Sequence, residues 1–291
     1  MNNFYKIGFG TWEFGGRTEP DPNNDDAKDI QNIQNAIKSG IKHIDTAEYY
    51  AGGKCEELVG QAIKDFSRND LYIATKVRDI KLSYDDVLKN CELSLKRLGL
   101  DYIDLYYVHL PNPNIPISET AKAFNELKRQ GLIKNIGICN AKVETMKNYQ
   151  NNLDYPIFAS QCHYNLIARE PQRTGLLEYC KENNINFIAW RPIQLPVPSM
   201  KIEPLYKREV YPILDKLADK YDKKNAQIAV RWLTQQENVN IIFKSTNPLH
   251  IQEIMDTKNF ELSPEDFKNL TDNFPRQEDT GFISSGKKPL E

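Results

Sequence analysis

Short apolar runs alternate with amphipathic stretches along almost the whole chain. Runs rich in β-branched and aromatic residues predict strands, and these runs are Tyr5–Thr11, a short stretch that ends at Asp45, Leu71–Thr75, Ile103–Val108, Lys134–Cys139, Ile157–Gln161, Asn186–Trp190 and Asn240–Phe243. Apolar residues at helical spacing predict the helices Asp26–Ser39, Cys55–Phe66, one between Ser83 and Gly99, Ser118–Gln130, Val143–Tyr149, Thr174–Asn183, Tyr211–Tyr221, Asn225–Gln236, Pro248–Thr257 and Pro264–Asn273. The chain is therefore predicted to form eight units, each a strand followed by a helix.

Strands that alternate with helices are typical of a parallel sheet whose faces are covered by helices. Eight consecutive units without a linker favour a closed (β/α)8 barrel, the TIM barrel. The rival fold is an open doubly wound sheet, whose dinucleotide site needs the pattern G-x-G-x-x-G after a strand. Gly8 and Gly10 begin such a pattern, but no correctly spaced third glycine follows. We predict one α/β barrel domain that spans residues 1–291.

The bulk composition excludes several classes of function. The 291 residues, 40% of them hydrophobic, are enough for a sizeable core, and the net charge of −2 gives no long-range attraction to nucleic acid or to an anionic membrane. Neither the N-terminus nor any apolar run has the features of a signal peptide or of a membrane span. The five cysteines are odd in number and lack C-x-x-C spacing, so we expect no disulfide framework and no metal site. We expect a cytoplasmic globular protein.

Polar or large aromatic side chains stand at the end of every predicted strand. In a barrel of this kind, functional side chains gather at the C-terminal ends of the strands. Read in order, these ends are Trp12, Asp45 with Tyr50, Lys76, His109, Cys139 with Asn140, Gln161, Trp190 with Arg191, and Lys244 with Ser245. Each alone has a structural explanation, such as a turn cap, a lysine that reaches solvent or a core histidine. Because one face of one fold collects all of them, we interpret them as a site.

Four of these residues fit acid catalysis on a carbonyl group. A carboxylate at Asp45 in a barrel core needs a cation, and Lys76 is the comparably placed lysine. A free tyrosine has a pKa of about 10 and an adjacent ammonium lowers it, so we expect Lys76 to make Tyr50 a usable acid. His109 would hydrogen-bond the substrate oxygen and orient it while negative charge develops there. Because no side chain supplies a hydride, a cofactor must supply it.

The same residues lie in segments that resemble those of the aldo-keto reductases. The likeness covers nearly the whole chain. The matching segments are Gly8–Trp12, His43–Tyr50, Glu56–Gly60, Ile73–Lys76, Asp104–His109, Gly137–Asn140 and Gln161. The resemblance implies a TIM barrel and hydride transfer from C4 of a nicotinamide to an aldehyde or ketone. The implied catalytic tetrad consists of Asp45, Tyr50, Lys76 and His109. His109 favours carbonyl reduction, because relatives with glutamate at that point reduce steroid C=C bonds instead.

The resemblance also implies which residues hold the nicotinamide. Cys139, Asn140 and Gln161 fall where the family binds the carboxamide. Trp190 falls where an aromatic ring stacks on the nicotinamide, in place of the usual tyrosine or phenylalanine. Cys139 replaces the usual serine, so one hydrogen bond is expected to be weaker, and Arg191 replaces a common serine with no predicted effect. The remaining residues predicted at this end of the cofactor site are Gly10, Thr11, Trp12 and Asp45.

The phosphate end of the cofactor site is predicted after the last strand. Lys244 and the N-terminus of a helix that is capped by Asn247 and begins with Pro248 would face an anion. The residues assigned to this end are Lys244, Ser245, Thr246, Asn247, His250 and Glu253. The family places an arginine for the 2′-phosphate at His250 and an asparagine for the adenine at Ile254, so this chain differs at both positions. Lys244 makes NADP(H) the preferred cofactor, and NAD(H) stays an alternative.

The substrate pocket is predicted around Trp12, Tyr50 and His109, with Leu110–Pro116 at its entrance. The stretch Gln194–Lys207 is short for the loop that clamps the cofactor in some relatives, so we expect fast cofactor release, measurable by stopped-flow fluorescence. The leading hypothesis is a reductase that acts on a small-molecule carbonyl. The alternatives are a cofactor-binding regulatory or scaffold protein, like the channel β-subunits of this family, and a sugar-phosphate isomerase. The physiological substrate, the reaction direction and the oligomeric state are left open.

Overall fold

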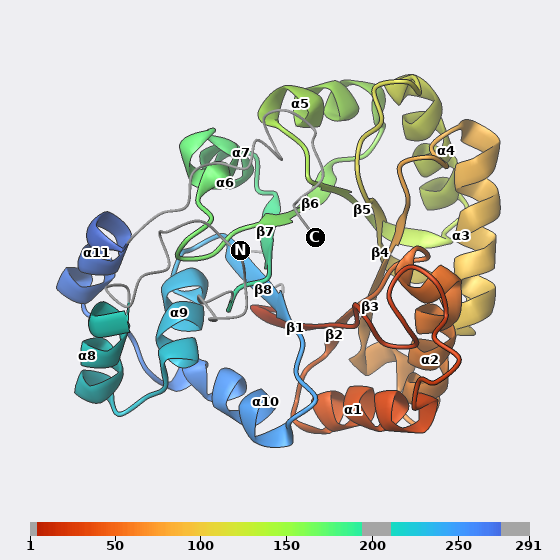
Figure 1. Ribbon diagram of the computed structural model, residues 1–291. Coiled ribbons are helices and arrows are strands. Elements are labelled where there is room, and N and C mark those ends of the chain that lie inside the picture. The colour runs from red at the N-terminus through yellow and green to blue at the C-terminus, as the bar shows by residue number, and fades with distance from the viewer. Residues whose placement is uncertain (1–4, 194–210, 275–291) are drawn as a thin grey trace.

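The strands close into a parallel barrel in which each strand pairs with its neighbours in sequence. The computed structural model describes residues 5–193 and 211–274, and within them β8 returns to pair with β1. The strands are β1 (Ile7–Gly10), β2 (His43–Asp45), β3 (Tyr72–Val77), β4 (Ile103–Val108), β5 (Ile133–Cys139), β6 (Ile157–His163), β7 (Asn186–Trp190) and β8 (Val239–Phe243). They form the inner ring of the molecule (Figure 1). The predicted (β/α)8 TIM barrel is confirmed.

Helices surround this ring (Figure 1). They are α1 (Asp26–Lys38), α2 (Lys54–Ile63), α3 (Tyr84–Leu98), α4 (Ile117–Arg129), α5 (Val143–Asn152), α6 (Glu170–Arg173), α7 (Leu176–Glu182), α8 (Tyr211–Tyr221), α9 (Asn225–Thr234), α10 (Pro248–Met255) and α11 (Pro264–Asn273). Around the ring, α10 lies between α9 and α1, and α11 returns to lie beside α8. The apolar stripe of α3 is buried through Val87, Leu95 and Leu98. The side chain of Ser83 caps α3 and Gly99 ends it at φ +67°, as the sequence predicted.

Two strands extend further than their apolar runs predicted. β3 includes Lys76, and β6 includes both Gln161 and His163. Lys76 and Gln161 were expected to end the strands, but the hydrogen-bonded pairing of the strands continues, because Lys76 pairs with Tyr107 and His163 pairs with Trp190. Alternate residues of a barrel strand face the interior whatever their polarity. Lys76 and Gln161 therefore mark inward positions of β3 and β6, and both strands continue past them.

The helix predicted over residues 174–183 is α7 (Leu176–Glu182), and a short helix that was not predicted, α6, precedes it. α6 ends at Arg173, and Gly175 at φ +77° separates it from α7. A residue in the left-handed region cannot continue a right-handed helix, and glycine adopts that region without strain. The predicted short loop Gln194–Lys207 lies outside the described residues.

Alternate strand residues face the barrel interior and carry the predicted site residues. The apolar layer inside the barrel includes Ala74, Tyr107, Ala159, Ile188 and Ile242. Two positions further along the same strands stand Lys76, His109, Gln161, Trp190 and Lys244. Gly137 leaves room for this layer, since a Cβ there would lie 2.3 Å from the ring of Tyr107. The two-residue period of a strand thus carries the site residues to the C-terminal end, above an apolar floor.

A buried carboxylate ties α2 and α3 to β3 beside the site. Glu56 is fully buried and accepts hydrogen bonds of 2.5 Å from Thr75 Oγ1 and 2.7 Å from Arg97 Nε. Burial raises the pKa of Glu56 above its usual range, and the Arg97 guanidinium opposes that shift. Because α2 follows directly on the turn that carries Tyr50, the contacts of Glu56 with Thr75 and Arg97 hold this turn against the barrel.

The protein is expected to lose stability as the pH falls from about 6.5 to about 4, because of His43 inside the barrel. Burial lowers the pKa of His43 from 6.5 to about 4. The Asp45 carboxylate opposes this shift, and the Lys76 ammonium adds to it. Over this window the unfolded chain binds a proton that the folded chain excludes. The free energy of unfolding should therefore decrease by about 3 kcal/mol at the acidic end from this group alone.

Urea denaturation at a series of pH values measures this effect, with His43→Leu as the comparison. The free energy of unfolding of the variant should decline less across the window, whatever its value at neutral pH. His250→Leu changes an exposed histidine on α10 and should keep the wild-type pH dependence. Identical slopes for wild type and His43→Leu would assign the acid sensitivity to carboxylates instead.

Candidate active site

An ion pair stands inside the barrel near the C-terminal ends of two neighbouring strands. Asp45 ends β2, Lys76 lies near the end of β3, and Lys76 Nζ is 2.5 Å from Asp45 Oδ1. The exposed fraction of the side chain is 0% for Lys76 and 1% for Asp45. Burial lowers the pKa of Lys76. The attraction of nearby groups, above all Asp45, raises it by more, so the pKa lies above its ordinary value. Lys76 is therefore charged at neutral pH and is the cation that the sequence required for Asp45.

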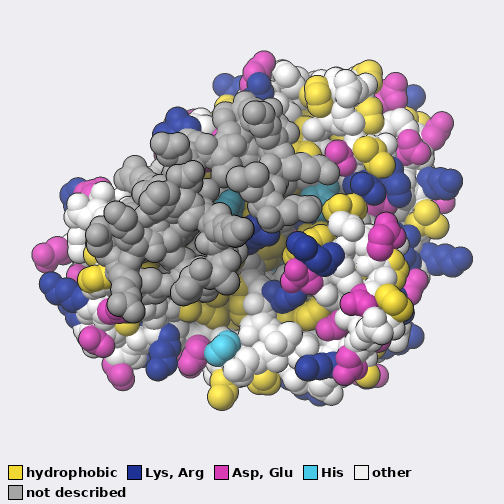
Figure 2. Space-filling view, viewed as in Figure 1, with side chains coloured by type: hydrophobic (Ala, Val, Ile, Leu, Met, Phe, Trp, Pro, Cys, Tyr) yellow, Lys and Arg dark blue, Asp and Glu magenta, His cyan; other side chains and the backbone are white. Residues whose placement is uncertain are grey.

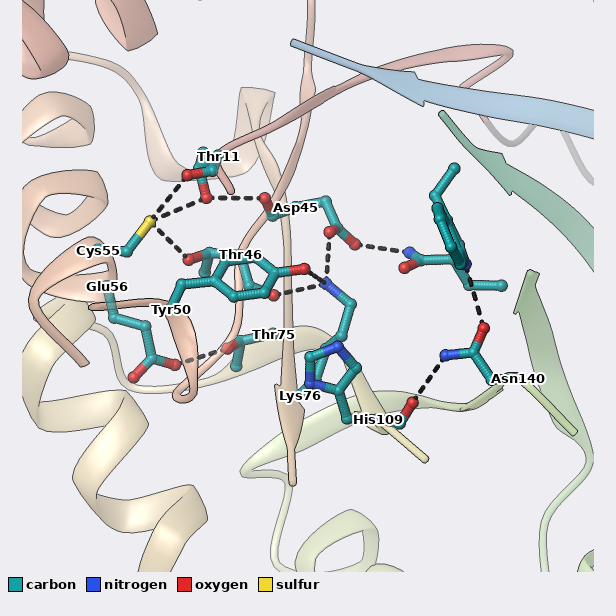
Figure 3. A network of polar contacts seen from close by, with 12 residues as sticks. Thr11, Asp45, Thr46, Tyr50, Cys55, Glu56, Thr75, Lys76, His109 and Asn140 are labelled. Carbon is teal, nitrogen blue, oxygen red and sulfur yellow. Dashed lines mark hydrogen bonds and ion pairs between the residues drawn. The ribbon is translucent and has the colours of Figure 1, made fainter. Parts of the chain in front are cut away.

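The phenol of Tyr50 lies beside this ammonium (Figure 3). Lys76 Nζ is 3.4 Å from Tyr50 Oη and 5.1 Å from the centroid of its ring. Tyr50 begins the 3-10 turn η1 (Tyr50–Gly53), in which Ala51, Gly52 and Gly53 all have positive φ. Because a side chain is strained in this backbone region, the small residues after Tyr50 are what allow the turn.

Two further predicted residues border the phenol. The ring centroid of Tyr50 lies 4.8 Å from that of Trp12 and 5.8 Å from that of His109, both in edge-to-face orientation. Figure 3 shows Tyr50, Lys76 and His109 converging from separate segments of the chain. The structure therefore brings the four predicted catalytic residues together, with Trp12 as a wall beside them.

Burial raises the pKa of Tyr50 to about 12, and the attraction of the Lys76 ammonium only partly offsets this shift. The prediction that Lys76 lowers the pKa of Tyr50 below the ordinary value is wrong for this structure. The reason is that burial destabilises the charged phenolate more than the attraction of the Lys76 ammonium stabilises it. The nearby Asp45 carboxylate also repels the phenolate. The phenol is therefore fully protonated at neutral pH, which is the state that a proton donor needs.

Amide side chains line the other side of the ion pair. Gln161 Nε2 donates to Asp45 Oδ2 at 2.8 Å, so each oxygen of the buried carboxylate has a partner. Asn140 Nδ2 donates to the backbone oxygen of His109 at 3.0 Å, and Asn140 Oδ1 accepts from Trp190 Nε1 at 3.1 Å. These contacts use one of the two N–H groups and one of the two lone pairs of Asn140. Its amide can therefore still donate and accept.

Cys139 and Thr11 are buried next to the site. Cys139 lies in the apolar layer of the barrel, and burial raises the pKa of its thiol well above the ordinary value. Thr11 Oγ1 donates to the backbone oxygen of Asp45 at 3.0 Å and lies 3.1 Å from Cys55 Sγ (Figure 3). Thr11 thus holds the end of β1 against Asp45, and Gly10 pairs with the same residue in the ladder. Contacts of Gly10, Thr11 and Cys139 with a cofactor stay predictions.

The predicted phosphate end lies where β8 leads into α10. Asn247 Oδ1 accepts from Leu249 N at 3.0 Å and Pro248 occupies the first turn, so the predicted helix cap is confirmed. Lys244 Nζ donates to the backbone oxygen of Trp12 at 2.7 Å and to Glu13 Oε2 at 3.2 Å. The lysine thus joins the end of β8 to the segment that follows β1.

The other residues assigned to this end surround the start of α10. Ser245 Oγ accepts from Asn247 N at 3.1 Å, which tightens the turn before the helix. Thr246 and His250 are exposed, and Glu253 is half-buried. An exposed helix N-terminus beside a lysine suits an anionic group. Binding of a phosphate by these residues stays a prediction.

Sequence reasoning missed His163, whose imidazole stacks on the indole of Trp190. The ring centroids are 4.4 Å apart and the planes differ by 12°. His163 lies two residues after Gln161 on β6, and so faces the same side of the strand. That two-residue spacing was the available signal, and it was missed because the strand was expected to end at Gln161.

Within residues 5–193 and 211–274, no group of three or more His, Cys, Asp or Glu side chains could hold a metal ion. The helices in these ranges are all too short or too polar to cross a bilayer. In Figure 2, acidic and basic side chains are interspersed over the coloured part of the face, with no broad area of one charge. The residues at the strand ends therefore remain the candidate site.

Comparisons with known proteins find relatives that share this fold. The model of the Aldo/keto reductase family matches residues 6–273. Aldo-keto reductase YhdN of Bacillus subtilis is 32% identical over 91% of this chain and 88% of its own length. A solved thermostable aldo-keto reductase in complex with epalrestat has 38% identity and a TM-score of 0.87, covering 92% of this chain and 94% of that one. An aldo-keto reductase from Klebsiella pneumoniae, solved with NADPH, has 26% identity and a TM-score of 0.83, covering 96% and 94%.

Proposed function

Because this chain belongs to the aldo/keto reductase family, we propose that it reduces an aldehyde or ketone of a small molecule to an alcohol with NADP(H). The observation that carries this proposal is the Tyr50 phenol, 3.4 Å from an ammonium that Asp45 holds in the barrel. His109 lies at the edge of the same phenol ring. A proton donor, a cation and an imidazole at one point are the groups that acid catalysis on a carbonyl oxygen needs.

Each of these residues has a distinct role in the proposed reaction. Tyr50 donates its phenol proton to the carbonyl oxygen as negative charge develops on that oxygen. Lys76 stabilises the phenolate that remains, because its ammonium lies beside Tyr50 Oη. Asp45 keeps this ammonium charged and in place, and His109 orients the carbonyl oxygen by a hydrogen bond.

The residues around the ion pair fit a nicotinamide cofactor. The amide of Asn140 retains both a donor and an acceptor, as recognition of a carboxamide requires, and Gln161 adds a second amide beside Asp45. Trp190 adds a half-buried aromatic ring next to Asn140. When bound, the cofactor would supply the hydride that no side chain can supply. Lys244 and the capped N-terminus of α10 support the choice of NADP(H), which carries a 2′-phosphate that NAD(H) lacks.

Consumption of NADPH with a panel of simple aldehydes and ketones tests the proposed function. Turnover with at least one carbonyl compound, absent without it, is the expected result. Quenching of protein fluorescence by NADPH without any turnover would favour the cofactor-binding regulatory protein. Failure of NADPH to quench the fluorescence would favour the isomerase.

Replacing His250 by arginine is expected to raise the preference for NADPH over NADH by about tenfold. Arginine carries a permanent charge and grips a phosphate through two hydrogen bonds, and a contact of this kind is worth about 1.5 kcal/mol. NADH lacks the 2′-phosphate, so the Kd of NADPH should fall while that of NADH changes little. Isothermal titration of both cofactors measures the ratio of the two Kd values.

The matched control for this variant adds an arginine elsewhere on α10. Gln252 is exposed and donates to Asp256, and Gln252→Arg should leave the ratio of the two Kd values near that of wild type. An equal gain in both arginine variants would indicate a general charge effect. An unchanged ratio in His250→Arg would mean that the 2′-phosphate binds away from this residue.

A further inference from the structure

The imidazole of His163 stacks on one face of the indole of Trp190. His163 at the end of β6 stacks on Trp190 at the end of β7, with 4.4 Å between centroids and 12° between planes. The two residues are partners in the ladder between β6 and β7, so the register of the sheet sets the stack. Because the imidazole covers one face of the indole, a flat ligand would need the other face.

Asn165 determines the tautomer of this imidazole. Asn165 is 1% exposed, and its Oδ1 accepts from Ile167 N at 2.9 Å and from Ala168 N at 2.8 Å. These two bonds fix the orientation of the amide, so its Nδ2 is the atom that lies 3.2 Å from His163 Nε2. His163 Nε2 must accept this hydrogen bond, which places the ring proton on Nδ1. The ring behind Trp190 is thus held in one orientation as a neutral imidazole.

The edge of Trp190 and the peptide after it are held as well. Asn165 Nδ2 also donates to the backbone oxygen of Arg191 at 3.0 Å, and Arg191 has a φ of +53°, which is unusual for a residue with a side chain. Trp190 Nε1 donates to Asn140 Oδ1, and Asn140 donates in turn to the backbone oxygen of His109. A phenylalanine at residue 190 could not make this contact, since it has no ring N–H. The indole is therefore fixed from its face, its edge and its backbone.

We propose that His163 is a positioning residue for the nicotinamide ring, a role that rests on the proposed function. It acts through Trp190, which it keeps in the one rotamer that also orients the amide of Asn140. A site that is already in its bound conformation avoids the loss of side-chain freedom on binding. Without the imidazole, Trp190 and Asn140 would have to be ordered by the ligand. The nicotinamide part of the cofactor should then bind less tightly, while the phosphate part is unaffected.

Calorimetric titration of His163→Ala with two ligands separates these parts. NADPH carries the nicotinamide, and 2′,5′-ADP carries only the adenosine and phosphate end. We expect the variant to bind NADPH about three- to tenfold more weakly, the range for one aromatic pair. Its affinity for 2′,5′-ADP should stay within about twofold of wild type, and His163→Phe, which restores a flat ring, should recover most of the NADPH affinity.

The matched control is Tyr164→Phe, one residue further along the chain. The phenol of Tyr164 donates to Gln236 at 3.2 Å and its ring packs against Trp232, outside the barrel interior, so both affinities should remain those of wild type. Unchanged NADPH affinity in His163→Ala would overturn the positioning role, and so would an equal loss for both ligands. Wild-type protein that fails to bind NADPH would overturn the proposed function itself, and the positioning role with it.

Discussion

Replacing Tyr50 by phenylalanine is expected to lower kcat about 10²- to 10⁴-fold, the range attributed to general acid catalysis. The ring of Tyr50 would still pack against Trp12 and His109, so the pocket should keep its shape. Only the proton donor beside the ammonium of Lys76 is lost. Steady-state kinetics with the best carbonyl substrate, together with the Kd of NADPH, measures the effect.

The Kd of NADPH should stay near that of wild type in this variant, because a loss of kcat with intact binding identifies a group used in the transition state. Tyr106→Phe is the matched control: Tyr106 lies on β4, but its ring stacks on Phe124 of α4 with 5.3 Å between centroids. The Tyr106→Phe variant removes a phenol hydroxyl outside the site and should leave kcat unchanged. A wild-type kcat in Tyr50→Phe would remove Tyr50 from the mechanism.

Replacing Lys76 by methionine is expected to destabilise the protein by about 3–5 kcal/mol and to abolish turnover. Methionine has a similar length, so the packing volume is largely kept. The Asp45 carboxylate, 1% exposed, would lose its cation and be left with the hydrogen bond from Gln161. An uncompensated charge in a barrel core is far more unfavourable than a neutral pair. Urea denaturation at neutral pH measures the change in the free energy of unfolding.

Two further variants show whether the lost charge is the cause. The double variant Asp45→Asn with Lys76→Met removes both charges and should recover a large part of the lost stability, although not the activity. Lys268→Met breaks the exposed i,i+4 pair with Asp272 and should change stability by less than about 1 kcal/mol. If the double variant is no more stable than Lys76→Met, the loss comes from packing and not from the charge.

The fold was readable from the sequence where turns interrupt the apolar runs. β4, β7, α8 and α11 have the bounds that the pattern predicted. For β4, β7 and α8, the reason is that turn or polar residues follow the apolar pattern directly. β3 and β6 were predicted too short, since Lys76 and Gln161 were taken as the ends of the strands. In a barrel, the polar residues of the site continue the strand and face inward, so polarity there reports the site and not a boundary.

The candidate site was readable for the same local reason. Asp45, Lys76 and His109 stand at strand ends, and a parallel barrel brings all such ends to one face. The direction of the pKa shift of Tyr50 was not readable, because it depends on how completely the surrounding segments exclude water. The stack of His163 on Trp190 depends on the register between β6 and β7, which no single segment encodes.

By itself, the sequence determined the order of the eight strand and helix units and the chemical groups that stand at the strand ends, since both follow from short-range periodicity. Only the tertiary structure decided that Lys76 Nζ comes within 3.4 Å of Tyr50 Oη and that burial keeps this phenol protonated. The stacking of the His163 imidazole on Trp190 was likewise decided by the tertiary structure. The physical reason is that distance and desolvation are set jointly by residues far apart in the chain. They are therefore properties of the closed barrel, while the period and type of side chain belong to each segment alone.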